Sequence, residues 1–474
     1  MQTTIRTVHS GAVRGRTHEH GSVFYGVPYA QGPTGAARFA PPVPHPGWSG
    51  IRDATRPGPT APQSRRDSFG SLDMSAYFGS GWRRGADYLT VDVWAPGPSP
   101  DLVPVMVFVH GGGFLGGNSA AALYDGTSFN RDSVVLVTVN YRLGPAGFLH
   151  LSNAPDNRGM LDVAAAVRWV ADNITEFGGD PTNITLFGQS AGATVVSGVL
   201  TDPYSAGLAR RAILQSSTST ITGQQASLVT AAFTAVLDRE PDAQALGEVS
   251  DDQLVAAVPA LLGLDLRAAT EHDPLGGITP FSLVLDHEPG HRMMEGASGE
   301  VDLLIGSNSD EGRLYLAPFG EIITTTAEDL HLTAARFTDE STQLVEAYRA
   351  QRPMASLGEL RAKILGDCIF GAPTRRMATA HADTATAATF AYEFTWSADA
   401  LDGTLGACHV IELPFVFDQL QLPALAGPRG MLGTAPVPAE LASRVHRAWI
   451  DFATTGNPGW APHTTTTPHV QSLP

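Results

Sequence analysis

Cysteine and lysine are scarce in this sequence of 474 residues. There are two cysteines, Cys368 and Cys408, and one lysine, Lys363. Two cysteines are too few for a disulfide framework, and nothing in their spacing suggests a metal cluster. A reducing compartment therefore fits the composition, although the composition does not require one.

Long apolar runs are also absent from the sequence. None approaches the roughly 18 consecutive apolar residues that a membrane-spanning helix needs. Residues 1–15 contain no apolar stretch of signal-peptide length. We therefore expect a soluble, cytoplasmic protein with no membrane partner, although the mature form of a secreted protein would show the same pattern.

Positive charge is in short supply. The sequence has 47 acidic against 30 basic residues, which gives a formal net charge of −17. A surface of this charge repels nucleic acids and anionic membranes. We therefore expect no nucleic-acid partner, and a small neutral or cationic ligand is favoured over a polyanion. The sequence leaves open whether the chain is a monomer or a small homo-oligomer.

Buried strands alternate with helices from Leu89 onward. Continuous runs of Val, Ile, Leu and Phe between helical segments indicate an α/β fold with a mostly parallel sheet covered on both faces. Residues 1–60 instead alternate short β-like runs with Pro and Gly clusters, which indicates small antiparallel strands ahead of the main core. The expected main strands are 89–94, 103–109, 134–140, 184–187, 301–305 and 389–396, with a helix over about 159–177.

Three segments are too long to be simple connections between strands. Two are alanine-rich and helical, and one is a polar, glycine-dotted loop. Because ligands bind at the carboxyl edge of open α/β sheets, we expect these segments to build a pocket there. We expect one domain over residues 1–474, with pocket-forming insertions at about 61–86, 218–300 and 315–384. The tail beyond Thr464 is poor in apolar residues and is expected to be frayed.

A serine flanked by two glycines follows the expected strand 184–187. In Gly188-Gln189-Ser190-Ala191-Gly192, the glycines allow a tight strand-to-helix turn that exposes the serine hydroxyl. A chain with 50 glycines also produces this pattern by chance. Ser190 is therefore a candidate nucleophile whose assignment depends on partners elsewhere.

A glycine triplet follows the expected strand 103–109, in His110-Gly111-Gly112-Gly113-Phe114. Such a triplet standing alone is typical of a flexible loop. Here it lies one strand-helix-strand cycle before Ser190, where an oxyanion-binding loop would be placed. We expect the N–H groups of Gly112, Gly113 and Ala191 to form an oxyanion hole.

A nucleophilic serine needs a base, and the base needs an acid to orient it. Both would follow Ser190 at the ends of later strands. The strand 301–305 leads to Asp310 and Glu311, and either could be the acid on spacing alone. His409 lies in the loop after strand 389–396, beside a buried apolar run, and is the candidate base.

With these residues in place, the sequence resembles the type-B carboxylesterases, the family of bacterial para-nitrobenzyl esterases and animal carboxyl- and cholinesterases. The resemblance covers nearly the whole chain. It implies the α/β-hydrolase fold and a serine hydrolase that cleaves carboxylic esters through an acyl-enzyme, with no cofactor and no metal. The matching runs are Phe24 to Ala30, Val93 to Pro96, His110 to Phe114, Asn140 to Gly144, Phe177 to Pro181, Gly188 to Gly192, Asp310 to Gly312 and Gly406 to His409.

The resemblance also assigns roles that spacing left open. It implies that Glu311 is the acid of the triad, that Ser216 lies close behind the triad, and that Arg142 and Asp162 form a buried ion pair. An amide or carbamate hydrolase using the same triad is the alternative reaction. A non-catalytic binding protein is a third hypothesis, disfavoured because all three triad residues are present.

The sequence departs from the family pattern in three features. Ala61 and Tyr88 replace the cysteines of the family's N-terminal disulfide, so this loop is not cross-linked. Ala86 replaces a glutamate that relatives pair with the arginine corresponding to Arg38. Gln189 replaces a glutamate before the nucleophile, and we expect it to change the electrostatics beside the triad without abolishing activity.

Substrate contacts are the least determined part of the site. We expect them from Phe114, Leu115 and Phe281, and from aromatic residues of the 61–86 loop, which could equally be core residues. The substrate itself is expected to be a small ester.

A second motif, His287-Glu288-Pro289-Gly290-His291, matches the H-E-x-x-H pattern of zinc sites. That pattern requires a helix to place both imidazoles on one face. Because Pro289 and Gly290 disfavour a helix there, we predict a surface turn and no metal site.

Overall fold

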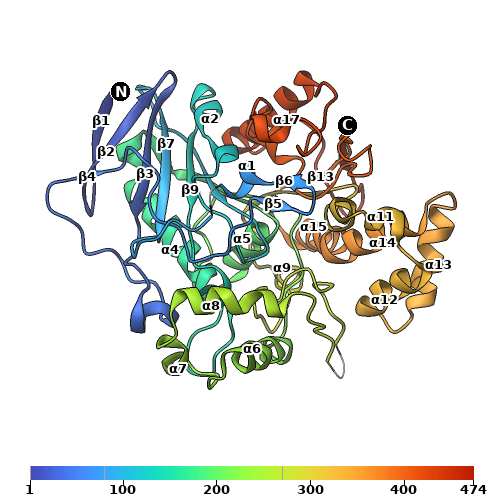
Figure 1. Ribbon diagram of the computed structural model, residues 1–474. Helices are drawn as coiled ribbons and strands as arrows, with labels where there is room; N and C mark the ends of the chain where they lie inside the picture. Colours follow the sequence, from blue (N-terminus) through green and yellow to red (C-terminus); the bar gives the residue numbers. More distant parts are fainter. Residues whose placement is uncertain (1, 80, 269–270) are drawn as a thin grey trace.

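A computed structural model describes residues 2–79, 81–268 and 271–474. Its centre is a 12-stranded sheet (Figure 1) with the order β1-β2-β3-β7-β9-β8-β10-β11-β12-β13-β14, in which β4 pairs with β2. The strands of this sheet are β1 (Thr3–Val8), β2 (Gly11–His18), β3 (Gly21–Pro28), β4 (Ile51–Asp53), β7 (Thr90–Pro96), β8 (Val103–Val109), β9 (Val135–Val139), β10 (Gly179–Gln189), β11 (Arg211–Gln215), β12 (Asp302–Asn308), β13 (Thr389–Phe394) and β14 (Val470–Leu473). Two further short strands, β5 (Ser68–Phe69) and β6 (Leu72–Asp73), pair only with each other.

The direction of the strands changes along the sheet. From β1 through β3 and β7 to β9, neighbouring strands are antiparallel. From β9 through β8 to β14, every neighbouring pair is parallel. The predicted combination of small antiparallel N-terminal strands with a mostly parallel main sheet is confirmed.

Side chains on the central strands alternate between two buried clusters. On β8, Val105 and Val107 belong to one cluster, whereas Met106 and Phe108 belong to the other. Both faces of the strand are therefore buried, which explains why the sequence shows a continuous apolar run. The first cluster contains residues of α4 (Arg158–Asn173), α5 (Ala191–Thr201) and α6 (Gly223–Leu237); the second contains residues of α2 (Thr127–Arg131), α16 (Leu413–Val416) and α17 (Ala439–Thr455).

The remaining helices lie mainly in the expected insertions. The group α12 to α14 lies at one end of the molecule, away from the N-terminal strands (Figure 1). A π-helical turn, Asp367–Gly371, connects α14 to α15. These helices are α1 (Ser75–Phe78), α3 (Gly144–Phe148), α7 (Ala243–Gly247), α8 (Asp251–Ala257), α9 (Pro289–Met294), α10 (Arg313–Leu316), α11 (Glu321–Thr324), α12 (Ala327–Phe337), α13 (Ser341–Gln351), α14 (Leu357–Gly366) and α15 (Ala372–Thr384).

Two local predictions are wrong. The tail is not frayed, because residues Val470–Leu473 form β14, which pairs in parallel with β13 and buries Leu473. The H-E-x-x-H segment is not a simple turn, because α9 begins at Pro289. Proline is tolerated in the first turn of a helix, where its missing N–H would have no partner. The structure also contains β11, which the sequence analysis missed.

The H-E-x-x-H motif is only partly helical. His287 precedes the helix and Glu288 is its N-terminal cap, so only His291 of the two histidines lies on α9. In the part of the chain that is described, no three His, Cys, Asp or Glu side chains are grouped as metal ligands. No described helix is long and apolar enough to cross a membrane.

Two buried arginines near the N-terminal strands pair with aspartates. Arg38 pairs with Asp251, at 3.1 Å, in place of the glutamate that is missing at position 86. Its guanidinium also donates to the carbonyl oxygen of Val249. Arg142 and Asp162 are fully buried and paired at 2.7 Å. Asp162 also accepts from the Arg142 backbone N–H, so the pair fixes the loop after β9 against α4.

We predict that Asp162→Asn destabilises the protein by about 3–5 kcal/mol, because it leaves the Arg142 charge buried without a counter-ion. Urea unfolding measures the loss. Asp252→Asn is the control, since Asp252 pairs with Arg84 at an exposed position and its loss should not shift the unfolding midpoint measurably. Equal midpoints for the two variants would contradict this role of Asp162.

Candidate active site

Ser190 lies between β10 and α5 in a strained turn. Its backbone angles are φ 57° and ψ −127°, a region that residues other than glycine rarely occupy. The flanking glycines are required by space: a Cβ at Gly188 would lie 2.6 Å from the backbone of Gly192, and one at Gly192 would lie 2.0 Å from the carbonyl oxygen of Val109. The turn is therefore held by the close packing of β10, β8 and the start of α5.

The glycine triplet follows β8 and lies beside Ser190. Gly112 and Gly113 both have positive φ angles, 116° and 64°. Thr279 donates its hydroxyl to the carbonyl oxygen of Gly113, and Nη1 of Arg66 donates to that of Gly112. Among the described residues, the N–H groups of Gly112 and Gly113 have no hydrogen-bond acceptor. These two donors are thus fixed in place and available, as is expected of an oxyanion hole.

His409 and Glu311 meet from two different loops. Nδ1 of His409 lies 2.5 Å from Oε2 of Glu311. The other oxygen of Glu311 accepts from the Ser216 hydroxyl at 2.5 Å and from the backbone N–H of Asn308 at 2.7 Å. Both side chains are 3 % exposed, so the pair is shielded from water. The structure therefore selects Glu311, and not Asp310, as the carboxylate that contacts His409.

Asp310 takes a different position. It lies 3.5 Å from Arg313 and accepts from the backbone N–H of Ala407. Spacing alone could not distinguish it from Glu311, because both follow β12 in the same turn.

The second ring nitrogen of His409 faces Gln189 and the cavity. The amide nitrogen of Gln189 lies 3.4 Å from Nε2 of His409. The ring of Phe370, from the π-helical turn, stacks on the imidazole with centroids 4.1 Å apart. Phe370 was not identified from the sequence, and it packs against one face of the imidazole.

A second carboxylate, Glu412, is buried close to Glu311 and His409. It accepts from Asn308 at 2.7 Å and from the Gln215 amide at 3.1 Å. Burial, and then the neighbouring charge of Glu311, raise its pKa from 4.5 to about 7. The sequence analysis missed Glu412, although an acid three residues after His409 and next to an apolar run was a visible signal.

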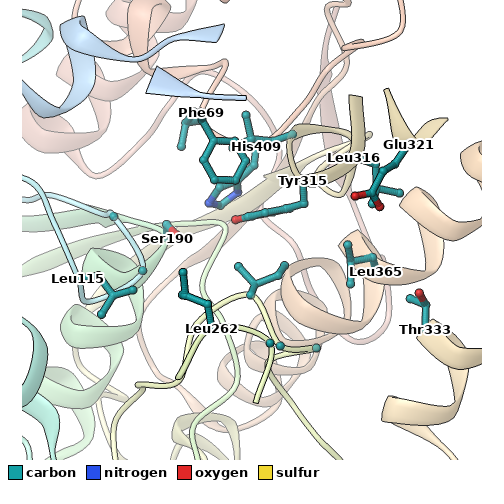
Figure 2. A pocket seen from close by; sticks show the side chains of 18 of the residues that line it. Phe69, Leu115, Ser190, Leu262, Tyr315, Leu316, Glu321, Thr333, Leu365 and His409 are labelled. Atoms are coloured by element: carbon teal, nitrogen blue, oxygen red, sulfur yellow. The ribbon is translucent and has the colours of Figure 1, made fainter. Parts of the chain in front are cut away.

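Ser190 and His409 open into one cavity of about 610 Å³. Figure 2 shows Leu115, Leu262, Tyr315 and His409 close to Ser190, and Glu321 and Thr333 farther away. All three expected insertions contribute to it. Its lining includes Arg66, Phe69, Met74 and Phe78 from the first, Leu262, Gly276 and Ile278 from the second, and Tyr315, Leu316, Glu321, Asp329, Leu332, Thr333, Arg336, Arg361 and Leu365 from the third.

The expected substrate contacts divide into two groups. Leu115 lines the cavity, as expected. Phe114 and Phe281 do not line it: both are 1 % exposed, and Phe114 packs edge-on against Phe148. The positive φ of Phe114, 63°, accompanies this inward orientation. Which of two neighbouring side chains faced the cavity could not be read from the sequence.

Comparison with known proteins agrees with this geometry. The model of the carboxylesterase family matches residues 2–472. The chain belongs to the carboxylesterase family. It is 34% identical over 470 residues to the para-nitrobenzyl esterase of Bacillus subtilis (strain 168), covering 97% of this chain and 91% of that protein. It is also 33% identical to the phenmedipham hydrolase of Pseudarthrobacter oxydans, covering 92% of this chain and 87% of the relative.

Solved structures extend the agreement to the whole fold. A PNB esterase structure superposes with a TM-score of 0.82 at 33% identity, covering 100% of this chain and 96% of that one. A Geobacillus stearothermophilus carboxylesterase gives a TM-score of 0.83 at 31% identity, covering 99% and 96%. This carboxylesterase therefore has the α/β-hydrolase fold and is a carboxylic-ester hydrolase, as the sequence predicted.

The raised pKa of Glu412 predicts how the stability of this esterase depends on pH. Below its pKa of 4.5 in the unfolded state, Glu412 is protonated in both the folded and the unfolded protein and does not change the free energy of unfolding. Between about pH 4.5 and about 7, the unfolded state binds fewer protons than the folded state, so stability falls over this interval and levels off above it. We expect Glu412→Gln to remove on the order of 1–3 kcal/mol of the decrease between about pH 5 and about pH 8. Denaturant titrations of both proteins at the two pH values test this; an equal decrease in both would show that Glu412 does not ionise in this range.

Proposed function

We propose that Ser190, His409 and Glu311 form the catalytic triad of this esterase, with Gly112, Gly113 and Ala191 as its oxyanion hole. The observation that supports this most directly is the 2.5 Å contact of His409 with Glu311, made by the same imidazole that shares the cavity with Ser190. Ser216 and Gln189 contact the triad without belonging to it. Ser216 donates a hydrogen bond to Glu311, and Gln189 contacts His409.

The proposed reaction begins with proton transfer. An ionised Glu311 only accepts hydrogen bonds, so it holds the proton of His409 on Nδ1 and leaves Nε2 free to take the proton of Ser190. The serine oxygen attacks the ester carbonyl, and the N–H groups of the glycine loop bind the oxyanion. His409 returns the proton to the leaving alcohol, and water then cleaves the acyl-enzyme by the same steps in reverse.

The cavity supports a proposal for the domain organisation as well. We infer one domain over residues 1–474 in which the segments 61–86, 218–300 and 315–384 serve to build the cavity, since each supplies part of its lining. Residue 80 and residues 269–270 of these segments lie outside the described residues. Leu115 is proposed as a substrate contact, with Phe114 and Phe281 supporting the wall from behind. The cytoplasmic location and the oligomeric state stay predictions.

The first test removes the nucleophile. We predict that Ser190→Ala lowers turnover of 4-nitrophenyl acetate by a factor on the order of 10⁴ or more, with an unchanged circular-dichroism spectrum. Ser227→Ala, which changes an exposed serine on α6, should behave as the wild type. Retained turnover in Ser190→Ala would assign the nucleophile to another residue.

The second test separates the two neighbouring acids. We predict that Glu311→Gln lowers kcat on the order of 10³- to 10⁴-fold, because His409 loses the carboxylate that orients it and stabilises its charged form. Asp310→Asn, the matched variant one residue away, should change kcat only a few-fold, since it contacts Arg313 instead. Steady-state kinetics on one ester decide between them, and a greater loss in Asp310→Asn would reverse the assignment.

A further inference from the structure

Arg66, which the sequence analysis did not consider, holds its guanidinium against the oxyanion loop. Nη1 donates to the carbonyl oxygen of Gly112 at 2.9 Å, and Cζ lies 5.6 Å from the centre of the Phe78 ring. The side-chain stem passes Gly116, where an added Cβ would lie 2.8 Å from Cδ of Arg66. The guanidinium is therefore fixed at the wall of the cavity that contains Ser190.

The charge of Arg66 is uncompensated, in contrast to the other arginines of the cavity. Arg336 pairs with Asp273 and Arg361 with Glu321, each at 2.7 Å. Within the described part of the chain, no carboxylate lies within ion-pair distance of Arg66. Burial lowers the pKa of its guanidinium, which reflects the cost of a charge removed from water. Of the five N–H donors of an arginine, one has an acceptor among the described residues.

A second hydrogen-bond donor, the hydroxyl of Tyr315, lines the same cavity. In Figure 2 the hydroxyl points to the side of the cavity where Ser190 and His409 lie. Its ring stacks on Phe370 at 6.0 Å with an angle of 11°, and burial raises the pKa of the phenol, so that it stays protonated. Among the described residues the hydroxyl has no hydrogen-bond partner, although it is close enough to Arg66 to interact with its charge.

We propose that the cavity binds esters that carry a free carboxylate, with Arg66 forming a charge-assisted bond to that carboxylate and Tyr315 donating to it. A planar guanidinium with unused N–H donors matches the geometry of a carboxylate. The inference rests on the proposed function, because it places the carboxylate of the substrate beside the proposed oxyanion hole. The net charge of −17 disfavours anions at long range, but a cation within contact distance in a partly dry cavity outweighs distant, screened charges.

Arg66 also has a contact that would affect every ester. The carbonyl oxygen of Gly112 belongs to the peptide group whose N–H is the donor of Gly113, so the bond from Arg66 polarises that donor. Loss of this effect would lower turnover of charged and neutral esters alike. The test must therefore compare kcat/KM for a charged ester with kcat/KM for its neutral counterpart, because the activity on a single ester would not separate the two effects.

The experiment measures kcat/KM for two pairs of esters. In the first pair the carboxylate is on the acyl side, in 4-nitrophenyl hydrogen adipate, and methyl 4-nitrophenyl adipate is its neutral counterpart. In the second pair it is on the alcohol side, in 4-acetoxybenzoate, and methyl 4-acetoxybenzoate is neutral. The quantity compared is the charged-to-neutral ratio in the wild type, Arg66→Met, Tyr315→Phe and Arg65→Met. Arg65 is the matched control, since it lies next to Arg66 but pairs with Asp67 and does not line the cavity.

We expect Arg66→Met to lower the ratio on the order of 10- to 100-fold in one pair, the cost of losing hydrogen bonds to a charged group. Tyr315→Phe should lower it several-fold and Arg65→Met should leave it unchanged. The pair that responds identifies the side of the ester that faces Arg66. An unchanged ratio in both pairs for Arg66→Met overturns the inference, even if turnover of every ester falls.

A binding measurement tests the carboxylate site independently of the proposed catalytic triad. Calorimetric titration of Ser190→Ala with monomethyl adipate and with dimethyl adipate requires no turnover. We expect tighter binding of the acid, and loss of that preference when Arg66→Met is added; equal binding of the two overturns the carboxylate site. Failure of the triad would appear instead as full turnover of neutral esters by Ser190→Ala.

Discussion

The hydrogen bond between Nδ1 of His409 and Oε2 of Glu311 joins two loops whose residues lie 98 positions apart in the chain. It exists only because β12 and β13 are parallel neighbours in register, so that the loops after them leave the same edge of the sheet. Backbone bonds from Asp310 to Ala407 and from His409 to Glu311 then hold the two loops together. The position of the imidazole relative to Ser190 therefore depends on the pairing of β10 through β13 as well as on the residues nearest to it.

The same bond places a negative charge in a dry region, and the structure compensates for it. Glu311 has three hydrogen-bonding contacts, from His409, Ser216 and the backbone of Asn308. Glu412, close behind, accepts from two side-chain amides in the described part of the chain, and burial, with the charge of Glu311 as the next cause, raises its pKa. The two carboxylates thus differ in their contacts: Glu311 bonds to His409, whereas Glu412 bonds to Gln215 and Asn308 and has a raised pKa.

Sequence patterns predicted the features that depend on local chemistry. The apolar run at 103–109 matched β8 because burial on both faces leaves a continuous signal, and Gly188 and Gly192 indicated a turn that tolerates nothing larger. Features that depend on distant partners were missed. The four residues of β14 have little apolar character and are ordered by the free edge of β13, whereas Arg66, Phe370 and Glu412 reach the site through contacts between separate segments. The orientation of Phe114 away from the cavity depends on a backbone angle that the sequence does not specify.

Charge at the cavity is set by individual neighbours more than by the net charge of the protein. Gln189 stands where the family has a glutamate, and its neutral amide lies 3.4 Å from the imidazole of His409. A glutamate there would add a third carboxylate to the environment of Glu311 and Glu412 and would raise the negative potential around Ser190. With glutamine in that position, the uncompensated guanidinium of Arg66 is opposed by less negative charge. The neutral Gln189 and the cationic Arg66 therefore act in the same direction, and together they make an anionic group in the substrate easier to accept than the overall composition implies.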